Sequence, residues 1–463
     1  MRVLFATSEM APLARVGGLA EAAAGLVKSL REQGVDVTIV MPDYSGAELS
    51  HQQHIDVAVP EWVGPCSVRS GLHEVLGDLT LVHVPGMDRP HPYTDQHGEG
   101  WHDNDRRFMA FSATVAALND QQKPDVLHLN DWHTAATLGF VHVQTPSVLT
   151  IHTLGYQGTM DAGWMKVLVR GAHQFEWFGA CNPLAGGVAL ADRVVAVSPN
   201  YAREILVPGP GMGLEGRLQA LGDRLVGIRN GIDTSMWNPS TDPHIAENYD
   251  DTRTEGKQAC RAELLELAGW SPSTAPVVGM VTRLVEQKGI DIVADSLRFL
   301  EAMPAKLFVL GSGSAHLAWT LAEAARMSPD QVFFHEGYDE QLAHKIFAGA
   351  DLFVMPSRFE PCGLAQMQAM AYGTIPVVTD VGGLHDTVID ADADRAEGTG
   401  FVTASVDTAG LVDALHRAVR AQRHAGRRAA IQRRAMTHDW SWAGPARRHI
   451  DIYEELSGIS SPR

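Results

Sequence analysis

Short aliphatic runs alternate with amphipathic, helix-like stretches along nearly the whole chain. The short runs are rich in Val, Ile and Leu and are bounded by polar or turn-forming residues, as buried strands are. Strands that alternate with helices predict β-α-β units and parallel sheets. The predicted strands are residues 3–7, 37–42, 126–130, 147–152 and 193–198 in the first half, and 277–284, 307–313, 331–337, 352–357 and 375–380 in the second.

A polar stretch over residues 244–258 interrupts this pattern, which restarts near residue 277. The chain has 463 residues, enough for two large domains at about 150 residues or more each. We therefore predict an α/β protein with two Rossmann-like domains, residues 1–240 and 241–440. Residues 441–463 carry apolar positions at rough helical spacing, which predicts a closing helix that packs back on the N-terminal domain.

Charge and cysteine content narrow the functional classes. The formal net charge is −18, which argues against a nucleic-acid partner because such binding needs a basic surface. Any anionic ligand must therefore meet a local cluster of Arg or Lys. The four cysteines lie far apart without CxxC spacing, so neither a disulfide framework nor a zinc site is expected, and a reducing cytoplasm is the expected location.

The N-terminal residues do not have the pattern of an export signal. Glu9 and Arg15 stand where a signal peptide needs an unbroken apolar core. No run of about 18 apolar residues occurs in the sequence, so no membrane-spanning helix is expected.

Two cations follow the first strand of the second domain. Arg283 lies at the end of the predicted strand, and Lys288 comes five residues later, just before a predicted helix. Open α/β sheets bind ligands at the carboxyl ends of their strands. Together the two charges would offset a diphosphate leaving group without a metal, whereas each taken alone fits a solvated surface cation better.

Two further loops place candidate groups at helix starts. Glu360 lies in the strand-to-helix loop PSRFEPCGL, where a capping carboxylate is the alternative interpretation. Glycine pairs precede helices at Gly17 with Gly18 and at Gly382 with Gly383. Such pairs allow close approach of a phosphate to backbone N–H groups, although a simple tight turn explains the first pair as well. Two such turns in different domains suggest one ligand held from both sides.

Three polar residues follow two neighbouring strands of the first domain. Asp131 and His133 come after the strand 126–130, and His152 ends the next one. Each histidine taken alone is better explained by a hydrogen-bonded structural role than by a catalytic one. No Cys, Asp or Glu stands at metal-ligand spacing beside them, so no metal site is expected.

Specific motifs occur from end to end of the chain. They are SEMAPLARVGGLAE, residues 88–108 (DRPHPYTDQHGEGWHDNDRRF), HLNDWHTA, TIHTLGYQG, VVAVSPNYAREI, GMGLEG, GIRNGIDTSMWNPSTDP, TRLVEQKGID, GYDEQLAHKIFAGADLFVMPSRFEPCGL, GGLHDTV and GTGF. In this order and spacing they resemble the bacterial glycogen synthases and plant starch synthases, a family of two-domain GT-B glycosyltransferases.

The resemblance implies two Rossmann-like domains whose parallel sheets face each other across a deep cleft. It also implies that glucose passes from ADP-glucose to the non-reducing end of an α-1,4-glucan, with retained configuration and without a metal or cofactor. The catalytic residues it implies are Glu360, Arg283, Lys288, His152 and Asp131. The donor-binding residues it implies are Arg15, Gly17, Gly18, Glu21, Asn230, Cys362, Gly363, Leu364, Gln368, Gly382 and Gly383.

Several positions depart from the family pattern. Arg15 replaces a lysine, Glu21 an aspartate, Thr153 an asparagine, Gln368 an aromatic residue and Asp380 a basic one. These changes leave open a related transferase with another nucleotide donor or a non-glucan acceptor. An inactive glucan-binding regulator is a further alternative, although the charged trio expected of an enzyme is present. The segment GSGSAH lacks the third glycine of a dinucleotide fingerprint, which argues against a dehydrogenase.

Overall fold

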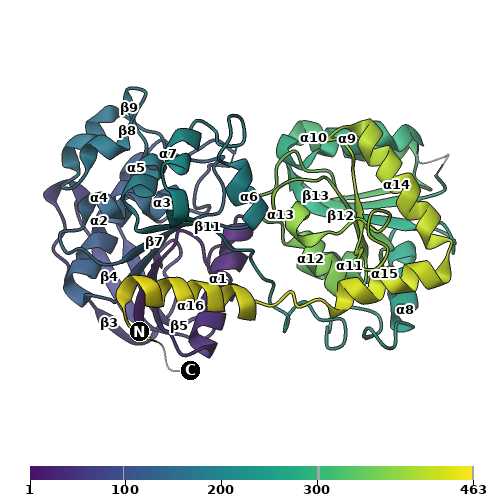
Figure 1. Ribbon diagram of the computed structural model, residues 1–463, viewed down its shortest axis with the longest axis horizontal. Coiled ribbons are helices and arrows are strands. Elements are labelled where there is room, and N and C mark those ends of the chain that lie inside the picture. Colours follow the sequence, from purple (N-terminus) through teal and green to yellow (C-terminus); the bar gives the residue numbers. More distant parts are fainter. Residues whose placement is uncertain (97, 300–302, 461–463) are drawn as a thin grey trace. The chain divides into compact units, whose positions relative to one another are not determined.

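The computed structural model describes residues 1–96, 98–299 and 303–460. The chain forms two compact units (Figure 1). Unit 1 comprises Met1–Gly231 together with the C-terminal segment from Trp442, and unit 2 comprises Ile232–Ser441. Residue 97 of the motif at 88–108 and the last three residues of the predicted closing segment lie outside the described residues.

Unit 1 is built on a nine-stranded sheet in the order β11-β10-β7-β6-β1-β2-β5-β4-β3. All strand pairs from β11 to β5 are parallel, and β5, β4 and β3 form an antiparallel edge. The strands are β1 (Arg2–Ala6), β2 (Asp36–Pro42), β3 (Ser50–His54), β4 (Ser67–His73), β5 (Gly77–His83), β6 (Val126–Asn130), β7 (Ser147–Ile151), β10 (Arg193–Ala196) and β11 (Leu225–Gly227). The five strands predicted for this half are confirmed, with ends shifted by at most two residues.

Helices flank this sheet, and a short hairpin stands apart from it. The α-helices are α1 (Gly18–Glu32), α2 (Asn104–Gln122), α3 (Asp131–Ala135), α4 (Thr137–Phe140), α5 (Pro183–Leu190), α6 (Pro199–Glu204) and α7 (Glu215–Gln219). The hairpin consists of β8 (Glu176–Trp177) and β9 (Ala180–Cys181). Strands β6 and β7 are buried at every position, as expected when helices cover both faces of a parallel sheet.

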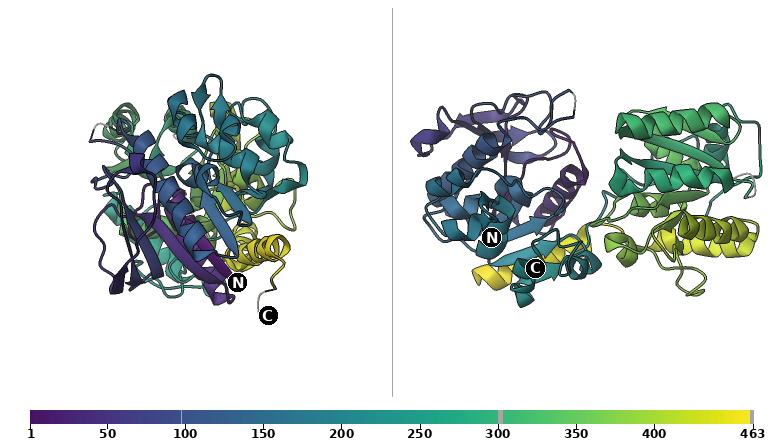
Figure 2. Two further views of the ribbon diagram at one scale, coloured as in Figure 1. Left: turned by 90° about the vertical axis from the view of Figure 1, so that its left-hand side faces the viewer. Right: turned by 90° about the horizontal axis from the view of Figure 1, so that it is seen from above.

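The C-terminal helix α16 (Ala443–Ser457) belongs to unit 1 and contacts α1 and β6 (Figures 1 and 2). Trp442, just before it, is buried against Gly25 of α1, where a Cβ would come within 2.1 Å of the indole Nε1. Farther along α16, the Tyr453 hydroxyl lies 2.5 Å from Nδ1 of His128 on β6. Both ends of the helix are therefore fixed to the unit.

Unit 2 has a six-stranded, fully parallel sheet in the order β14-β13-β12-β15-β16-β17. Its strands are β12 (Val277–Leu284), β13 (Lys306–Gly313), β14 (Val332–Glu336), β15 (Leu352–Met355), β16 (Ile375–Val378) and β17 (Phe401–Val402). The five strands predicted here are confirmed, while β17 was missed because it is only two residues long. The hydrophobic core joins residues of these strands to α9, α10 and α14.

The helices of unit 2 are α8 (Gly256–Leu267), α9 (Ile290–Ser296), α10 (Ala315–Met327), α11 (Glu340–Gly349), α12 (Ala365–Ala371), α13 (Gly382–Thr387), α14 (Thr408–Gln422) and α15 (Ala425–Thr437). Helix α14 packs with α9, and α11 packs with α8 (Figure 1). None of the helices in the described part of the chain is long and apolar enough to cross a membrane.

The polar stretch that suggested a boundary is an integral part of unit 2. The Tyr249 hydroxyl donates to the carbonyl of Tyr372 at 2.8 Å, and the buried ammonium of Lys257 donates to the carbonyl of Ala348 at 2.8 Å and to Oγ1 of Thr374 at 2.7 Å. These polar residues satisfy buried acceptors, so their polarity does not mark a linker.

Candidate functional site

Lys288 and Glu360 form an ion pair at the carboxyl edge of the unit 2 sheet. Lys288 ends the short 3-10 turn Glu286–Lys288 after β12, and Glu360 lies in the loop after β15. The ammonium Nζ lies 2.5 Å from Oε2 of Glu360, and Ser357 Oγ donates to the same oxygen at 3.1 Å. The side chains are only 16% and 7% exposed. Neither residue is therefore the isolated surface group that sequence alone left possible.

Glycine brings these two segments together. Gly289, directly after Lys288, has φ +67°, and a Cβ there would lie 2.2 Å from the carbonyl oxygen of Pro356. Any larger residue would push the Lys288 turn away from the loop that carries Glu360. The local chain thus requires glycine at this position for the ion pair to form.

Further hydrogen bonds fix the Glu360 loop to the Lys288 turn. Arg358 forms a bidentate ion pair with Asp291, with Nη1–Oδ1 and Nη2–Oδ2 distances of 2.8 and 2.6 Å. Its Nη1 also donates to the carbonyl of Glu286. Gln287 Nε2 donates to the carbonyl of Phe359 at 3.0 Å. A bidentate guanidinium contact restricts orientation as well as distance, so the loop is held in a defined position.

Arg283 is the penultimate residue of β12, and its surroundings differ from those of Lys288, which follows this strand. Its side chain is exposed, and within residues 1–96, 98–299 and 303–460 it has no hydrogen-bond or ion-pair partner. The edge of the sheet therefore offers one cation engaged by a carboxylate and one available to an incoming anion.

The glycine pair of unit 2 is used partly for close packing. The N–H of Gly383 donates to the carbonyl of Glu360 at 2.9 Å, and a Cβ on Gly383 would lie 2.0 Å from the carbonyl oxygen of Cys362. This N–H therefore already donates to a protein carbonyl, and its contact with a phosphate or sugar stays a prediction. Gly382 begins α13 with φ +44°.

Gln366, which sequence reasoning missed, holds the loop before α12. Its buried Nε2 donates to the carbonyls of Cys362 and Gly363, at 3.1 and 2.9 Å, and Cys362 is itself buried. Gly363 has φ +72°, the turn for which glycine was expected. A glutamine at a helix start gives no local sign that its amide turns back to the preceding carbonyls.

Gln368 and Asp380, the two positions of unit 2 that depart from the family pattern, lie close to this loop in the sequence. Leu364 precedes α12, and the half-buried Gln368 one turn later makes no side-chain hydrogen bond to the described residues. Asp380 is paired with Nδ1 of His385 at 2.7 Å, and both side chains are about half exposed. The carboxylate at position 380 is therefore hydrogen-bonded to a side chain of α13.

In unit 1, Asp131 and His152 meet at the carboxyl ends of β6 and β7. Asp131 has a left-handed backbone, φ +53°, and its Oδ1 accepts the backbone N–H of His152 at 2.7 Å. Asn130 Nδ2 donates to the carbonyl of Ala6, which leaves its Oδ1 facing His152 Nε2 at 2.9 Å. The imidazole therefore carries its proton on Nε2, and Nδ1 is an acceptor.

Burial determines the protonation states of Asp131 and His152. It raises the pKa of Asp131 to about 7, with a smaller opposing effect from the backbone N–H groups of His152 and Thr153. Burial likewise lowers the pKa of His152 to about 3. Near neutral pH the histidine is neutral and the aspartate is close to half-protonated, so this pair presents hydrogen-bonding groups with little net charge.

Glu9 organises the loop before α1 and was not singled out from the sequence. Its buried carboxylate accepts the N–H groups of Val16 and Gly17 at 2.8 and 2.9 Å, and the Tyr93 hydroxyl at 2.8 Å. The Gly17 amide thus donates to a carboxylate of the protein, and its contact with the donor stays a prediction. Gly18 begins α1, where helix N–H groups are unpaired by geometry.

The remaining candidate site residues of unit 1 lie in different local environments. Arg15 and Glu21 form an ion pair at 3.2 Å, so two departures from the family pattern contact each other. His133 is buried and stacked on Tyr93 with ring centroids 4.7 Å apart, which fits the structural alternative. Thr153 Oγ1 accepts the N–H of Gly155 at 3.1 Å, and Asn230 is buried in the turn after β11.

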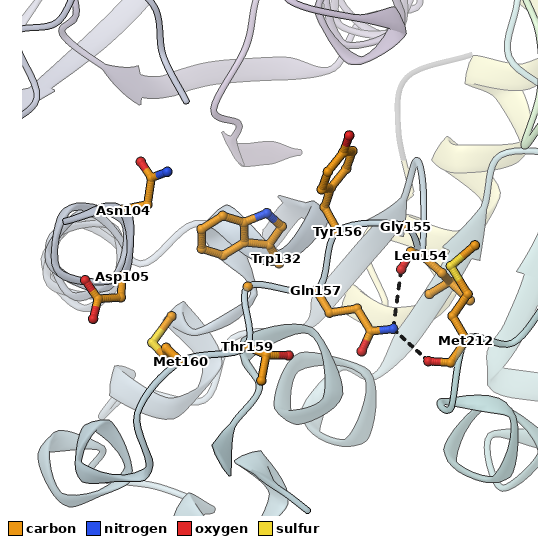
Figure 3. Close-up of a pocket in the computed structure, with 11 residues that line it drawn as sticks. Asn104, Asp105, Trp132, Leu154, Gly155, Tyr156, Gln157, Thr159, Met160 and Met212 are labelled. Atoms are coloured by element: carbon orange, nitrogen blue, oxygen red, sulfur yellow. Dashed lines mark hydrogen bonds between the residues drawn. The ribbon is translucent and has the colours of Figure 1, made fainter. Parts of the chain in front are cut away.

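Unit 1 contains a cavity of about 520 Å³ (Figure 3). Some of its lining residues directly follow Asp131 and His152 in the sequence. It is lined by Asn104, Asp105, Trp132, Leu154, Gly155, Tyr156, Gln157, Gly158, Thr159, Met160 and Met212. Gln157 Nε2 donates to the carbonyls of Leu154 and Met212, which fixes one wall. No group of three potential metal ligands occurs among the residues that the structure describes.

Two family models match the chain. Residues 2–220 match the starch synthase catalytic domain, and residues 269–436 match the glycosyl transferases group 1. The glycogen synthase of Halorhodospira halophila is 40% identical over 98% of this chain and 99% of its own length. That of Marinomonas sp. is 38% identical over 98% of this chain and 100% of its own length.

Solved structures agree with the family models. The catalytic domain of starch synthase IV from Arabidopsis thaliana, bound to ADP and acarbose, superposes with a TM-score of 0.88 at 30% identity, covering 99% of each chain. A sucrose-phosphate synthase from Thermosynechococcus elongatus shares the fold, with a TM-score of 0.63 at 19% identity over 99% of this chain and 100% of its own. The chain therefore belongs to the glycogen and starch synthase family of glycosyltransferases, which has the GT-B fold.

Proposed function

We propose that the protein transfers glucose from ADP-glucose to the non-reducing end of an α-1,4-glucan with retention of configuration. The observation that carries this proposal is the Lys288–Glu360 ion pair at the sheet edge where β12 also ends with Arg283, whose side chain has no ion-pair partner among the described residues, in a member of a glucan-synthesising family. The pair combines a cation suited to a phosphate with a carboxylate suited to a sugar. Family membership makes ADP-glucose the first donor to consider.

Unit 2 would bind the donor. In the transfer, the bond between the anomeric carbon and the β-phosphate oxygen breaks, so negative charge builds up on the leaving ADP and positive charge on the sugar ring. Arg283 and Lys288 would stabilise the leaving diphosphate, because fixed charges act most strongly where charge develops. Glu360 would face the oxocarbenium-like sugar or orient the donor.

The described contacts of Glu360 support a positioned rather than a mobile carboxylate. Lys288 and Ser357 both bind its Oε2, and the N–H of Gly383 binds its backbone carbonyl. Gln368, whose amide makes no bond to the described side chains, is available for a hydroxyl of the nucleotide ribose. An amide binds such a hydroxyl without the charge that a carboxylate would bring.

Unit 1 would bind sugar hydroxyls through His152 and Asp131. Nδ1 of His152 is an acceptor because Nε2–H is bonded to Asn130, and the low pKa of His152 keeps the ring neutral. Asp131 would contact the sugar with the carboxyl oxygen that does not bind the His152 backbone. The acceptor hydroxyl adds to the anomeric carbon on the face that ADP leaves, and its proton passes to the departing phosphate oxygen.

A donor screen tests this proposal. The purified protein is incubated with glycogen or maltooligosaccharides and with ADP-, UDP- or GDP-glucose, and both nucleotide release and chain growth are measured. We expect ADP release with matching chain growth. Release of UDP or GDP without ADP would contradict the assigned donor, and ADP release without chain growth would contradict the assigned acceptor.

A further inference from the structure

The buried amide of Gln366 joins the loop that carries Glu360 to helix α13. Its Nε2 donates to the carbonyls of Cys362 and Gly363, and it also lies 3.1 Å from Oγ1 of Thr387 on α13. Gln366 and Thr387 are 0% and 4% exposed, so water does not compete for these contacts. One side chain therefore connects two segments that follow neighbouring strands, β15 and β16.

The partners of this amide determine its orientation. All three groups around Nε2 are acceptors, because two are carbonyls and the Thr387 hydroxyl donates its proton to the carbonyl of Gly383 at 2.7 Å. With the amide reversed, Oε1 would face the two carbonyl oxygens and both hydrogen bonds would be lost. In the observed orientation Oε1 lies against Gly363, where a Cβ would come within 2.4 Å of it. Glycine at position 363 therefore makes room for the glutamine amide as well as for the turn.

These contacts close a hydrogen-bonded ring on the backbone of Glu360. The carbonyl of Glu360 accepts the N–H of Gly383 at 2.9 Å, and the carbonyl of Gly383 accepts the Thr387 hydroxyl. The Gln366 amide leads from Thr387 back to the carbonyl of Cys362, two residues beyond Glu360. Displacing one buried member of such a network leaves its neighbour without a partner, so the members move together. The position of the Glu360 backbone therefore depends on Gln366.

We propose that Gln366 is a positioning residue for Glu360 and acts through α13. This proposal rests on the proposed function, in which the Glu360 carboxylate faces the transferred sugar. Lys288 and Ser357 hold the carboxylate end of Glu360, whereas the ring holds its backbone end. A displacement of about 1 Å at a reacting centre lowers a rate by about a hundredfold, so a small shift of this backbone reaches the transfer step.

A double-mutant cycle in turnover tests the link between the two residues. Gln366→Met removes the amide at nearly constant length, and it should lower kcat about ten- to a hundredfold while the KM for the nucleotide sugar changes less than about threefold. In a Glu360→Gln background the same change should lower kcat by less than about twofold, because the carboxylate that Gln366 positions is then gone. Equal fold-losses of kcat in the two backgrounds would overturn the proposal.

Two substitutions of Thr387 repeat the test from the other side of the ring. Thr387→Val removes the hydroxyl at nearly constant shape and should lower kcat as Gln366→Met does, whereas Thr387→Ser keeps the hydroxyl and should have wild-type turnover. Gln432→Met is the matched control, because Nε2 of Gln432 also donates to a carbonyl at an end of α12, that of Gly373 at 3.0 Å. Its turnover should equal that of the wild type.

Hydrogen–deuterium exchange without substrate separates this proposal from the proposed function. The Gly383 amide, read by mass spectrometry, should exchange about five- to tenfold faster in Gln366→Met and Thr387→Val than in the wild type or Gln432→Met, the effect of losing one buried hydrogen bond. Unchanged exchange in both folded variants overturns the proposal, whichever donor the protein uses. Faster exchange with normal kcat also overturns it. Faster exchange in a protein whose wild type transfers no glucose supports the link to the Glu360 backbone and contradicts only the proposed reaction.

Discussion

The ammonium of Lys288 lies 2.5 Å from Oε2 of Glu360, and the two residues come from different loops of one sheet edge. This contact joins the group proposed to hold the leaving phosphate to the group proposed to face the sugar. A donor phosphate would approach a lysine whose position Glu360 already fixes. Loss of either partner should therefore affect the transfer step more than the fold.

Replacing Lys288 by alanine should lower kcat by about a hundredfold or more, as expected for a preorganised charge at the transition state. The measurement is steady-state ADP release at saturating ADP-glucose. Lys345→Ala is the matched control, because Lys345 also pairs with a glutamate, Glu263, at 2.7 Å in unit 2. Near-normal turnover of Lys288→Ala would refute the assigned role.

Replacing Glu360 by glutamine keeps the size and the hydrogen bond from Ser357 but removes the charge. We expect kcat to fall far more than donor affinity, because the carboxylate is proposed to act when positive charge develops on the sugar. Donor affinity is measured by ADP-glucose titration calorimetry alongside turnover. A parallel loss of both quantities would make Glu360 a binding residue instead.

The raised pKa of Asp131 predicts an unusual pH dependence of the free energy of unfolding. Its pKa is about 7 when folded, against about 3.9 when unfolded. The folded state therefore binds the proton more tightly, and this residue makes stability fall as pH rises from 4 to 7, by roughly 4 kcal/mol in total. Asp131→Asn keeps the acceptor for the His152 N–H and also tolerates the left-handed backbone.

Thermal unfolding across pH 4 to 8 measures this effect. The Asn variant should melt above the wild type at pH 8, and the two curves should converge near pH 4, where both side chains are neutral. Transfer activity of the variant should fall, since the proposed sugar contact changes. A wild-type protein that is more stable than the variant at pH 8 would disprove the burial argument.

A substitution at Gly383 tests the close packing of this residue against the loop that carries Glu360. A methyl group at this position would meet the Cys362 carbonyl at 2.0 Å, so Gly383→Ala should destabilise unit 2 by about 1–3 kcal/mol. It should also displace Glu360, whose carbonyl accepts the Gly383 N–H. Gly426→Ala in α15 is the control, with no atom within 4 Å of the added carbon. Equal melting temperatures for both variants would contradict the packing.

The sequence predicted the sheets well because their strands are buried on both faces and are continuous aliphatic runs. It missed the antiparallel edge, since β3 reads SHQQH and is exposed at every position. An edge strand with this composition resists further pairing and looks like a loop. The polar run at 244–258 lies in unit 2 and within the predicted second domain, and the polar groups of Tyr249 and Lys257 in it are buried against carbonyls far away in sequence.

At the site, local patterns identified residues but not their partners. Arg283 and Lys288 look alike in sequence, yet among the described residues only Lys288 has an ion-pair partner, Glu360, which lies in a loop 72 residues away. Glu9 has the appearance of an ordinary surface acid, and its role depends on Val16, Gly17 and Tyr93 reaching it in the fold. Gly17 and Gly383 were correctly placed at helix starts, but their N–H groups are taken by protein acceptors.

The most direct test of the central claim is the position of newly added sugar. Maltooligosaccharides are extended with ADP-glucose carrying radiolabelled glucose, and the product is digested with an exo-acting β-amylase that removes maltose from non-reducing ends. The account predicts that label enters the glucan with equimolar ADP release and is removed as labelled maltose. Absence of incorporation, or label that resists this enzyme, would contradict it.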